Sequence, residues 1–290
     1  MKAVLEKYHG LGNDYLVFDP NKNTLRLSPE NVRLICDRHF GAGADGILEG
    51  PMPGKDRMQM RIWNPDGSVA EKSGNGVRIF AKYLKDAGYV QKSHVVIDMG
   101  GADTEVRYLN EEGTRLKASM GQASFWSDRI PVTGPKREVV NETMMFGRIP
   151  YKVTCVSMGN PHAVIFLNEI SEDIVCRIGR NSECAEYFPE RINTLIMKVM
   201  DRSNIEIEIY ERGAGYTLAS GSSGCAAAAA AYRQGLTDPK MYVRMPGGVL
   251  EVEILEDWTV LMTGDVGYVG KITLGSGLTE TLRTLEAPEP

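Results

Sequence analysis

Two Ser-Gly pairs are the residues of this 290-residue chain whose type and spacing could do chemistry. Ser73-Gly74 and Ser220-Gly221 lie 147 positions apart (220 − 73 = 147), and each opens an apolar, helix-like run. Small residues at the start of a helix let a ligand reach the free backbone N–H groups, where the helix dipole favours an anion. Two equivalent half-sites suit a reaction that moves a proton from one face of a tetrahedral carbon to the other.

A simpler interpretation of each serine alone is an N-cap, because serine before a helix usually accepts a backbone hydrogen bond. The pairing in register favours a site. Two further pairs repeat at the same shift, Gly12-Asn13 with Gly159-Asn160 (159 − 12 = 147) and Gly100-Gly101 with Gly247-Gly248 (247 − 100 = 147). The chain is therefore interpreted as a duplication.

Polar residues near the repeated turns could serve a ligand. Asn13 and Asn160 stand in equivalent turns and either hold a substrate amine or carboxylate or only form the turn. Glu211 and Arg212 follow an alternating strand; arginine suits bidentate capture of a carboxylate, and a structural ion pair is the alternative. His162 follows the second turn and gives either acid–base support or a structural hydrogen bond.

Composition narrows the class of protein. The apolar fraction is 42%, the mean hydropathy is −0.24, and no apolar run approaches the length that spans a bilayer. Polar residues run through positions 1–20, so no signal peptide is expected and the cytoplasm is the default compartment. A net charge of −5 without a basic cluster argues against a nucleic-acid surface.

The sequence motifs indicate neither a metal nor a cofactor. The chain has no P-loop, no dinucleotide fingerprint and no metal-spaced His/Asp/Glu cluster. Its five cysteines are scattered and are expected to be reduced, mostly buried thiols: Cys36, Cys155, Cys176, Cys184 and Cys225. The expected partner is a small-molecule substrate, with neither nucleic acid nor membrane, and a homodimer is left open.

The elements that must position these residues are short strands with one main helix in each half. Helices are predicted from Ser28-Pro29 to before Gly41, over Gly76–Lys85, and through the alanine run Ala226–Ala231 to Tyr232. The predicted strands are Met1–Tyr8, Tyr15–Phe18, Met58–Ile62, Val95–Asp98, Glu105–Leu109, Leu116–Met120, Lys152–Val156, Ala163–Leu167, Thr194–Met200 and Ile205–Tyr210. This order indicates an α+β fold and lacks the alternation of a doubly wound sheet.

Six ordered motifs along nearly the whole chain carry a family resemblance. They are His9-Gly10-Leu11-Gly12-Asn13-Asp14-Tyr15, Asp37-Arg38-His39-Phe40-Gly41, Asn64-Pro65-Asp66-Gly67-Ser68, Gly74-Asn75-Gly76, Gly159-Asn160-Pro161-His162 and Tyr210-Glu211-Arg212-Gly213-Ala214-Gly215. Together they resemble the diaminopimelate epimerase family, cofactor-independent amino-acid epimerases of lysine and peptidoglycan precursor synthesis. The resemblance implies two pseudo-symmetric duplicated domains, each a mainly antiparallel sheet wrapped around a central helix. Residues 1–121, completed by a segment at about 266–285, would form one domain, and residues 122–265 the other.

The resemblance also implies roles for particular residues. One substrate carboxylate would lie on the helix N-termini at Gly74-Asn75 and Gly221-Ser222. Matching positions for the distal end of the substrate are Asn64, Asn193 and Arg212, and those for the amine or its support are Asn13, Asn160 and Glu211.

Members of the family transfer the α-proton with two cysteines. In this chain serines stand at the two corresponding positions, Ser73 and Ser220. A serine hydroxyl is far less acidic than a thiol, so an assisting base would be needed, with His162 and Glu211 as candidates. Gly46 is a second departure, since some members carry glutamine there. The leading hypothesis is a serine-based epimerase of diaminopimelate. The alternatives are a form that binds substrate without turnover, a related isomerase or lyase, and a non-catalytic amino-acid-binding protein.

Overall fold

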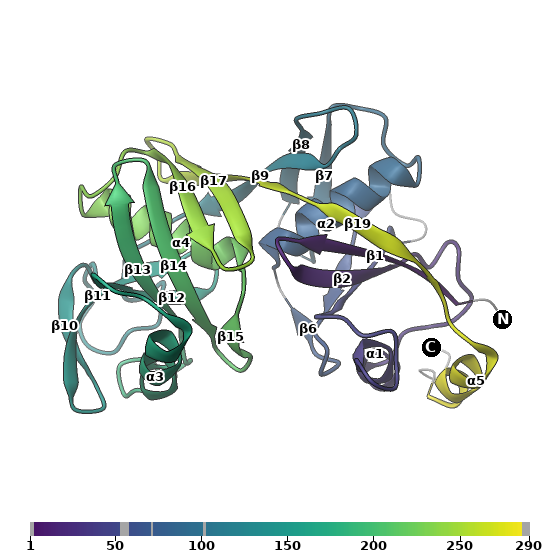
Figure 1. The fold of residues 1–290 in the computed structure, drawn as a ribbon, viewed down its shortest axis with the longest axis horizontal. Helices are drawn as coiled ribbons and strands as arrows, with labels where there is room; N and C mark the ends of the chain where they lie inside the picture. The colour runs from purple at the N-terminus through teal and green to yellow at the C-terminus, as the bar shows by residue number, and fades with distance from the viewer. Residues whose placement is uncertain (1–2, 53–57, 71, 101–102, 286–290) are drawn as a thin grey trace. The chain divides into compact units, whose positions relative to one another are not determined.

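The structure is a computed structural model that describes residues 3–52, 58–70, 72–100 and 103–285 (Figure 1). The chain forms two compact units, called unit 1 (Met1–Ala118 with Gly264–Pro290) and unit 2 (Ser119–Thr263). It passes from unit 1 to unit 2 within β9 (Arg115–Gln122) and returns within β18 (Thr259–Asp265). Gly101 of the third repeated pair and the start of the strand expected from Met1 lie outside the described residues.

Unit 1 contains a six-stranded sheet with a helix against each face. The strand order is β19 (Gly267–Thr273), β1 (Val4–Gly10), β2 (Asn13–Phe18), β3 (Ile47–Glu49), β5 (Arg61–Trp63) and β6 (Val69–Ala70). Only β2 and β3 pair in parallel. The antiparallel pairing of β19 with β1 brings the C-terminal segment back into the sheet that starts the chain.

Side-chain alternation along β2 builds two cores. Tyr15 and Val17 pack in the core that includes helix α2 (Gly74–Asp86), whereas Leu16 and Phe18 pack with helix α1 (Pro29–Cys36). Successive residues of a strand point to opposite faces, so one strand serves both helices. Helix α5 (Ser276–Thr284) adds Leu282 to the second core.

Helix α2 is buried from Gly74 to Leu84, because further strands cover it. These strands run in the order β9, β8 (Asp103–Tyr108), β7 (His94–Asp98) and β4 (Met58–Gln59). Val95, Ile97 and Val106 of β7 and β8 lie in the same core as the apolar residues of α2. The start of α2 is thereby held rigidly within unit 1.

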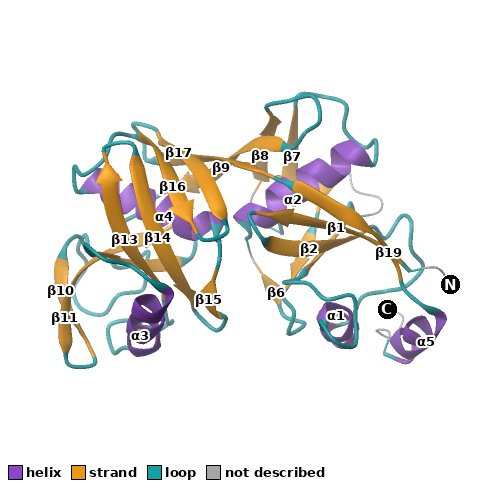
Figure 2. Cartoon of the chain, viewed as in Figure 1, coloured by secondary structure: helices purple, strands orange, loops and turns teal. Residues whose placement is uncertain are grey.

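Unit 2 is built from a long mixed sheet and helix α4 (Gly221–Arg233) (Figure 2). The strand order is β10 (Glu142–Phe146), β11 (Ile149–Ser157), β12 (Pro161–Phe166), β13 (Asn193–Asp201), β14 (Asn204–Glu211), β16 (Lys240–Met245), β17 (Gly248–Ile254) and β18, with β15 (Gly215–Thr217) paired to β14. The pairs β12–β13 and β14–β16 are parallel and the others are antiparallel. Helix α4 contacts six of these strands, and Ala226–Ala231 are completely buried. Helix α3 (Glu172–Ser182) packs on β13, β14 and β15.

The predicted α+β class with mostly antiparallel strands is confirmed. Helices α2 and α4 are related by the shift of the repeated motifs at both ends (221 − 74 = 147 and 233 − 86 = 147). The predicted cap of α1 is also confirmed, since the Ser28 side chain accepts a hydrogen bond from the Asn31 N–H.

Three features differ from the predictions. The strand expected over Met58–Ile62 divides into β4 and β5, which join different sheets. In the turn between β1 and β2, positive φ falls on Leu11 (56°) and Gly12 (85°), and Asn13 is already in β2. Pairing of Gly10 with Asn13 leaves two turn residues, which favours a type I′ hairpin in which both have positive φ. Helices α3 and α5 and eight strands (β3, β6, β10 and β15–β19) were not predicted from the sequence.

Candidate active site

The first half-site is the start of α2 in unit 1. Ser73 is the N-cap, with extended backbone angles (φ −143°, ψ 117°), and its Oγ accepts a hydrogen bond from the Gly76 N–H at 2.9 Å. The Tyr15 hydroxyl of β2 lies 3.3 Å from the same Oγ. Ser73 is therefore an N-cap and at the same time half-exposed and in contact with a second hydroxyl group.

A chain of amides extends from this helix start into the β1–β2 turn. Asn75 donates to the Asn13 Oδ1 (3.1 Å), and Asn13 donates to the Asp45 carboxylate (2.9 Å). The side-chain Oδ1 of Asn75 in turn accepts a hydrogen bond from Arg78, which is completely buried one turn further along α2. The predicted residues Asn13, Ser73 and Asn75 are thus brought together in unit 1.

The second half-site is the start of α4 in unit 2. Ser220 is the N-cap with similar backbone angles (φ −141°, ψ 127°), but its side chain makes no capping hydrogen bond. Asn160 donates to the Ser222 Oγ at 3.3 Å, and Ser222 is the second residue of α4. This contact repeats the Asn13–Asn75 contact of unit 1 at the same sequence separation of 62 residues.

His162 lies on β12 with its side chain completely buried. Neither ring nitrogen makes a hydrogen bond of good geometry, although main-chain groups of Asn160 and Val156 are close. Burial lowers the pKa of His162 to about 4; the main-chain groups oppose this shift and the charge of Arg212 adds to it. The imidazole is therefore neutral near neutral pH and a weak base.

Arg212 directly follows β14. Its backbone N–H donates to the Asn193 Oδ1 (3.0 Å), and its Nη1 donates to the Glu190 carbonyl (3.0 Å). Arg212 is exposed and forms no ion pair with any residue that the structure describes, so the alternative of a structural ion pair with Glu211 is not supported. Its remaining N–H groups are accessible to an anion.

The other predicted polar residues form hydrogen bonds with neighbouring groups of the protein. Asn193 is 4% exposed and donates to the Pro161 carbonyl at 3.0 Å, so its amide links β12 to Arg212. Glu211 accepts from the Thr217 hydroxyl at 3.3 Å. Asn64 donates to the Ser68 Oγ at 2.9 Å within its own turn. None of these contacts brings Asn64 to the start of α2.

Gly46 has a steric reason to lack a side chain. A Cβ added there would lie 2.4 Å from the Trp63 carbonyl oxygen and 2.7 Å from the Tyr15 ring. The ring of Tyr15 therefore takes the space that a larger residue at position 46 would need. Tyr15 has no predicted role, although it belongs to one of the family motifs and the 147-residue shift relates it to His162 (162 − 15 = 147).

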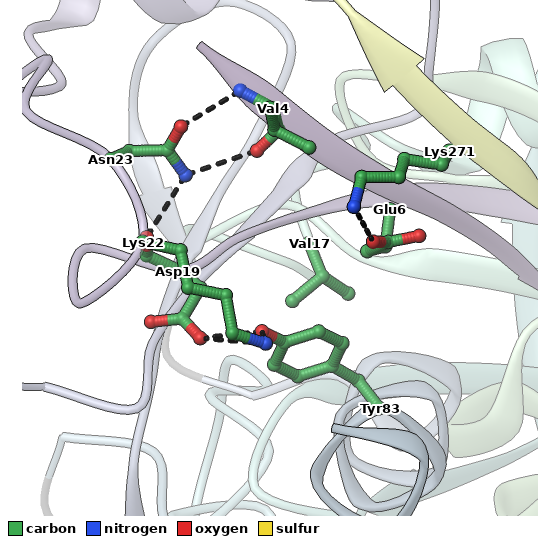
Figure 3. Close-up of a pocket in the computed structure, with 8 residues that line it drawn as sticks. All are labelled: Val4, Glu6, Val17, Asp19, Lys22, Asn23, Tyr83 and Lys271. Carbon is green, nitrogen blue, oxygen red and sulfur yellow. Dashed lines mark hydrogen bonds and ion pairs between the residues drawn. The ribbon is translucent and has the colours of Figure 1, made fainter. Parts of the chain in front are cut away.

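A cavity of about 270 Å³ lies elsewhere in unit 1 and contains none of the predicted site residues (Figure 3). Its charged lining groups pair with one another: Lys22 with Asp19 and the Tyr83 hydroxyl, and Lys271 with Glu6. The buried Asp19 also accepts from Tyr83. Because these charged groups already pair with one another, the lining of the cavity does not indicate a ligand site. The candidate site therefore remains at the starts of α2 and α4.

Comparison with known proteins decides the family. The family described as diaminopimelate epimerase matches residues 5–126 and 154–269. The chain belongs to the diaminopimelate epimerase family. Diaminopimelate epimerase 2 of Nostoc sp. is 47% identical over 261 residues, which are 90% of this chain and 91% of that protein. Diaminopimelate epimerase of Synechococcus elongatus is 39% identical over 268 residues, 91% of this chain and 95% of that protein.

Solved structures share the fold of these epimerases. A probable proline racemase from Agrobacterium radiobacter has a TM-score of 0.69 at 14% identity, covering 94% of this chain and 93% of that chain. A PhzF-family phenazine biosynthesis protein from Bacillus anthracis has a TM-score of 0.66 at 15% identity, covering 95% and 99%. At these identities the likeness shows the fold alone. Membership of the diaminopimelate epimerase family confirms the predicted enzyme class, an isomerase of lysine biosynthesis.

Three further observations concern the described residues. No helix among them is long and apolar enough to cross a membrane. Nowhere in the described part of the chain do three or more His, Cys, Asp or Glu side chains gather as a metal site would need. None of the five cysteines, all of them described, forms a disulfide, and Cys36, Cys155 and Cys225 are buried, which confirms the prediction of mostly buried thiols.

Proposed function

We propose that this protein interconverts LL- and meso-diaminopimelate by two-base transfer of the α-proton, with Ser73 and Ser220 as the proton-transfer groups. The observation that carries the proposal is the pair of helix starts with matching amide contacts, Asn13–Asn75 and Asn160–Ser222. The finer fold assignment is part of it: units 1 and 2 are duplicated copies, each with its sheet wrapped around α2 or α4. Residues 1–121 with about 266–285, and residues 122–265, remain the proposed domains.

The two helix starts suit one substrate carboxylate. The backbone N–H groups at Gly74-Asn75 and Gly221-Ser222 belong to the first turns of α2 and α4, where the dipole favours an anion. Arg212 supplies a guanidinium suited to bidentate binding of the distal carboxylate, with Asn64 and Asn193 in support. Asn13, Asn160 and Glu211 are proposed to support the substrate amine.

The proposed reaction conserves protons overall. An ionised oxygen at one serine takes the α-proton, and the electron pair of the C–H bond stays on carbon. The hydroxyl of the opposite serine then donates its proton to the other face of that carbon, so the two serines exchange protonation states and the configuration inverts. Each transfer by a positioned group contributes typically about 10²–10⁴-fold.

Serine needs a base to ionise near neutral pH, and the two candidates differ. His162 has a pKa of about 4 because it is buried, so it is a poor acceptor for a hydroxyl proton at neutral pH. Glu211, on β14 and hydrogen-bonded to Thr217, is a half-buried carboxylate with an acceptor function. We keep both His162 and Glu211 as supporting residues. No cofactor is required by this scheme, the substrate is an amino acid, and the cytoplasm is the expected compartment.

The test is incorporation of solvent deuterium at the substrate α-carbon, followed by NMR with LL- and with meso-diaminopimelate. An epimerase exchanges the α-proton and forms the other stereoisomer, and Ser73→Ala with Ser220→Ala should abolish both. A lyase would give a new product. Binding measured by calorimetry without exchange would instead favour the binding form, an outcome made plausible by the low acidity of serine.

A further inference from the structure

Tyr15 places a hydroxyl group beside the proton-transfer position of unit 1. The residue is 8% exposed, lies on β2, and its hydroxyl oxygen is 3.3 Å from the Ser73 Oγ. Its ring packs so closely over Gly46 that even a Cβ there would be 2.7 Å from it. The ring therefore has a fixed place, and its hydroxyl is aimed at Ser73 by packing.

The chemistry of an ionised group at position 73 fixes the direction of this hydrogen bond. Between two neutral hydroxyls either oxygen can donate. An ionised oxygen or sulfur only accepts, so Tyr15 must then be the donor. The Gly76 N–H already donates to the same atom at 2.9 Å. Two donors aimed at one atom stabilise its ionised form and lower its pKa.

We propose that Tyr15 is a positioning residue that orients the side chain at position 73 and stabilises its ionised form through a donated hydrogen bond. Among the described residues, Ser220 makes no side-chain capping hydrogen bond, and the buried His162 occupies the position of unit 2 that corresponds to Tyr15. The inference rests on the proposed function in one respect: it takes Ser73 as the proton-transfer group.

A thiol at position 73 makes the acidity measurable without any substrate. In the Ser73→Cys protein, the rate of alkylation by iodoacetamide is followed against pH, with the modified position located by mass spectrometry. The expected pKa at position 73 is below the ordinary value of about 8.5. Tyr15→Phe, which keeps the ring over Gly46, should raise that pKa by about one unit and slow alkylation near pH 7 about tenfold.

The matched control is Tyr108→Phe. Tyr108 is also buried and also donates to α2, at the Ala81 carbonyl (2.7 Å), which is away from the helix start. This variant should leave the pKa at position 73 unchanged. The charged groups linked to this helix start are Lys72 beside Ser73, Arg78 one turn on, and Asp45 through Asn13 and Asn75, and all are the same in both variants.

Two results would overturn the inference. One is a pKa at or above about 8.5 in the Ser73→Cys protein, a result that does not depend on the folding of any tyrosine variant. The other is an effect of Tyr15→Phe no larger than that of Tyr108→Phe. Failure of the proposed function is distinguishable: if the thiol titrates as expected but diaminopimelate shows no α-exchange, the substrate assignment fails and the role of Tyr15 stands.

Discussion

The starts of α2 and α4 share a backbone frame and differ in the side chains around it. Both helices begin after an extended serine, and in each unit the asparagine of the repeated Gly-Asn pair contacts the second helical residue. Ser73, however, caps its helix and contacts Tyr15, whereas Ser220 makes no capping bond. The two helix starts therefore share their backbone geometry and the position of one side-chain contact, and they differ in the side chains around each serine.

Two further positions sharpen the contrast. Gly46 corresponds to Asn193 (193 − 46 = 147), and the glycine leaves room for the Tyr15 ring while the asparagine holds Pro161 and Arg212. Arg212 corresponds to Pro65 (212 − 65 = 147), so only unit 2 contributes a cation at this point of the repeat. The two units therefore differ in residue type at two positions that the 147-residue shift equates.

The largest expected effect comes from making both proton-transfer positions thiols. Ser73→Cys combined with Ser220→Cys should raise α-proton exchange on diaminopimelate about a thousandfold, because a thiolate is available near neutral pH and a serine alkoxide is not. Each single replacement should do much less, since one face would still be served by a poor acid, and the effects should be non-additive. NMR in deuterated buffer measures exchange and inversion for the four combinations.

Two results would contradict this scheme. A Ser/Ser protein that epimerises as fast as the double variant would show that serine here has its own activating base. A double variant that binds ligand and stays inactive would require another substrate.

The next largest expected effect is on the affinity for diaminopimelate when Arg212, which has no counterpart cation in unit 1, is substituted. Arg212→Ala should weaken binding of diaminopimelate by about 3–4 kcal/mol in calorimetry, because the distal carboxylate would lose a charge-assisted partner. Arg212→Lys should restore little, since an ammonium lacks the planar fork. Arg202→Ala is the control, an exposed arginine of the same unit that pairs with Asp238. Unchanged affinity in Arg212→Ala would reduce Arg212 to a structural residue that donates to Glu190.

His162 occupies the position of unit 2 that corresponds to Tyr15, and only a histidine there makes the free energy of unfolding depend on acid pH. The folded pKa of His162 is about 4 and its unfolded value is about 6.5, so the unfolded state binds the proton first. The contribution of neutral His162 to the free energy of unfolding is therefore fully present above about pH 6.5. It falls by about 3 kcal/mol as the pH drops to about 4. His162→Phe should remove this part of the acid dependence in urea denaturation. An identical acid dependence in both proteins would show that His162 gains its proton without unfolding cost.

The sequence predicted the helices at the candidate site better than the side-chain contacts around them. Small residues after Ser73 and Ser220 and the alanine run of α4 mark helix starts by local chemistry, so both helices were predicted. The contact of Tyr15 with Ser73 and the burial of His162 arise from sheet packing between residues far apart in the chain, which periodicity does not encode. The positive φ of Leu11 likewise follows from the two-residue turn that the pairing of β1 with β2 leaves.

The smallest predicted effect is a direct test of the difference between the two serines. Ser73→Ala removes the side-chain acceptor of the Gly76 N–H and should lower the free energy of unfolding by about 1 kcal/mol. Ser220→Ala removes no capping bond and should stay within about 0.5 kcal/mol of the unsubstituted protein. Both are measured by urea denaturation at pH 7, where His162 contributes equally. Equal losses in the two variants would mean that Ser220 caps α4 in solution, and the two helix starts would then be alike in structure and differ only through Tyr15 and His162.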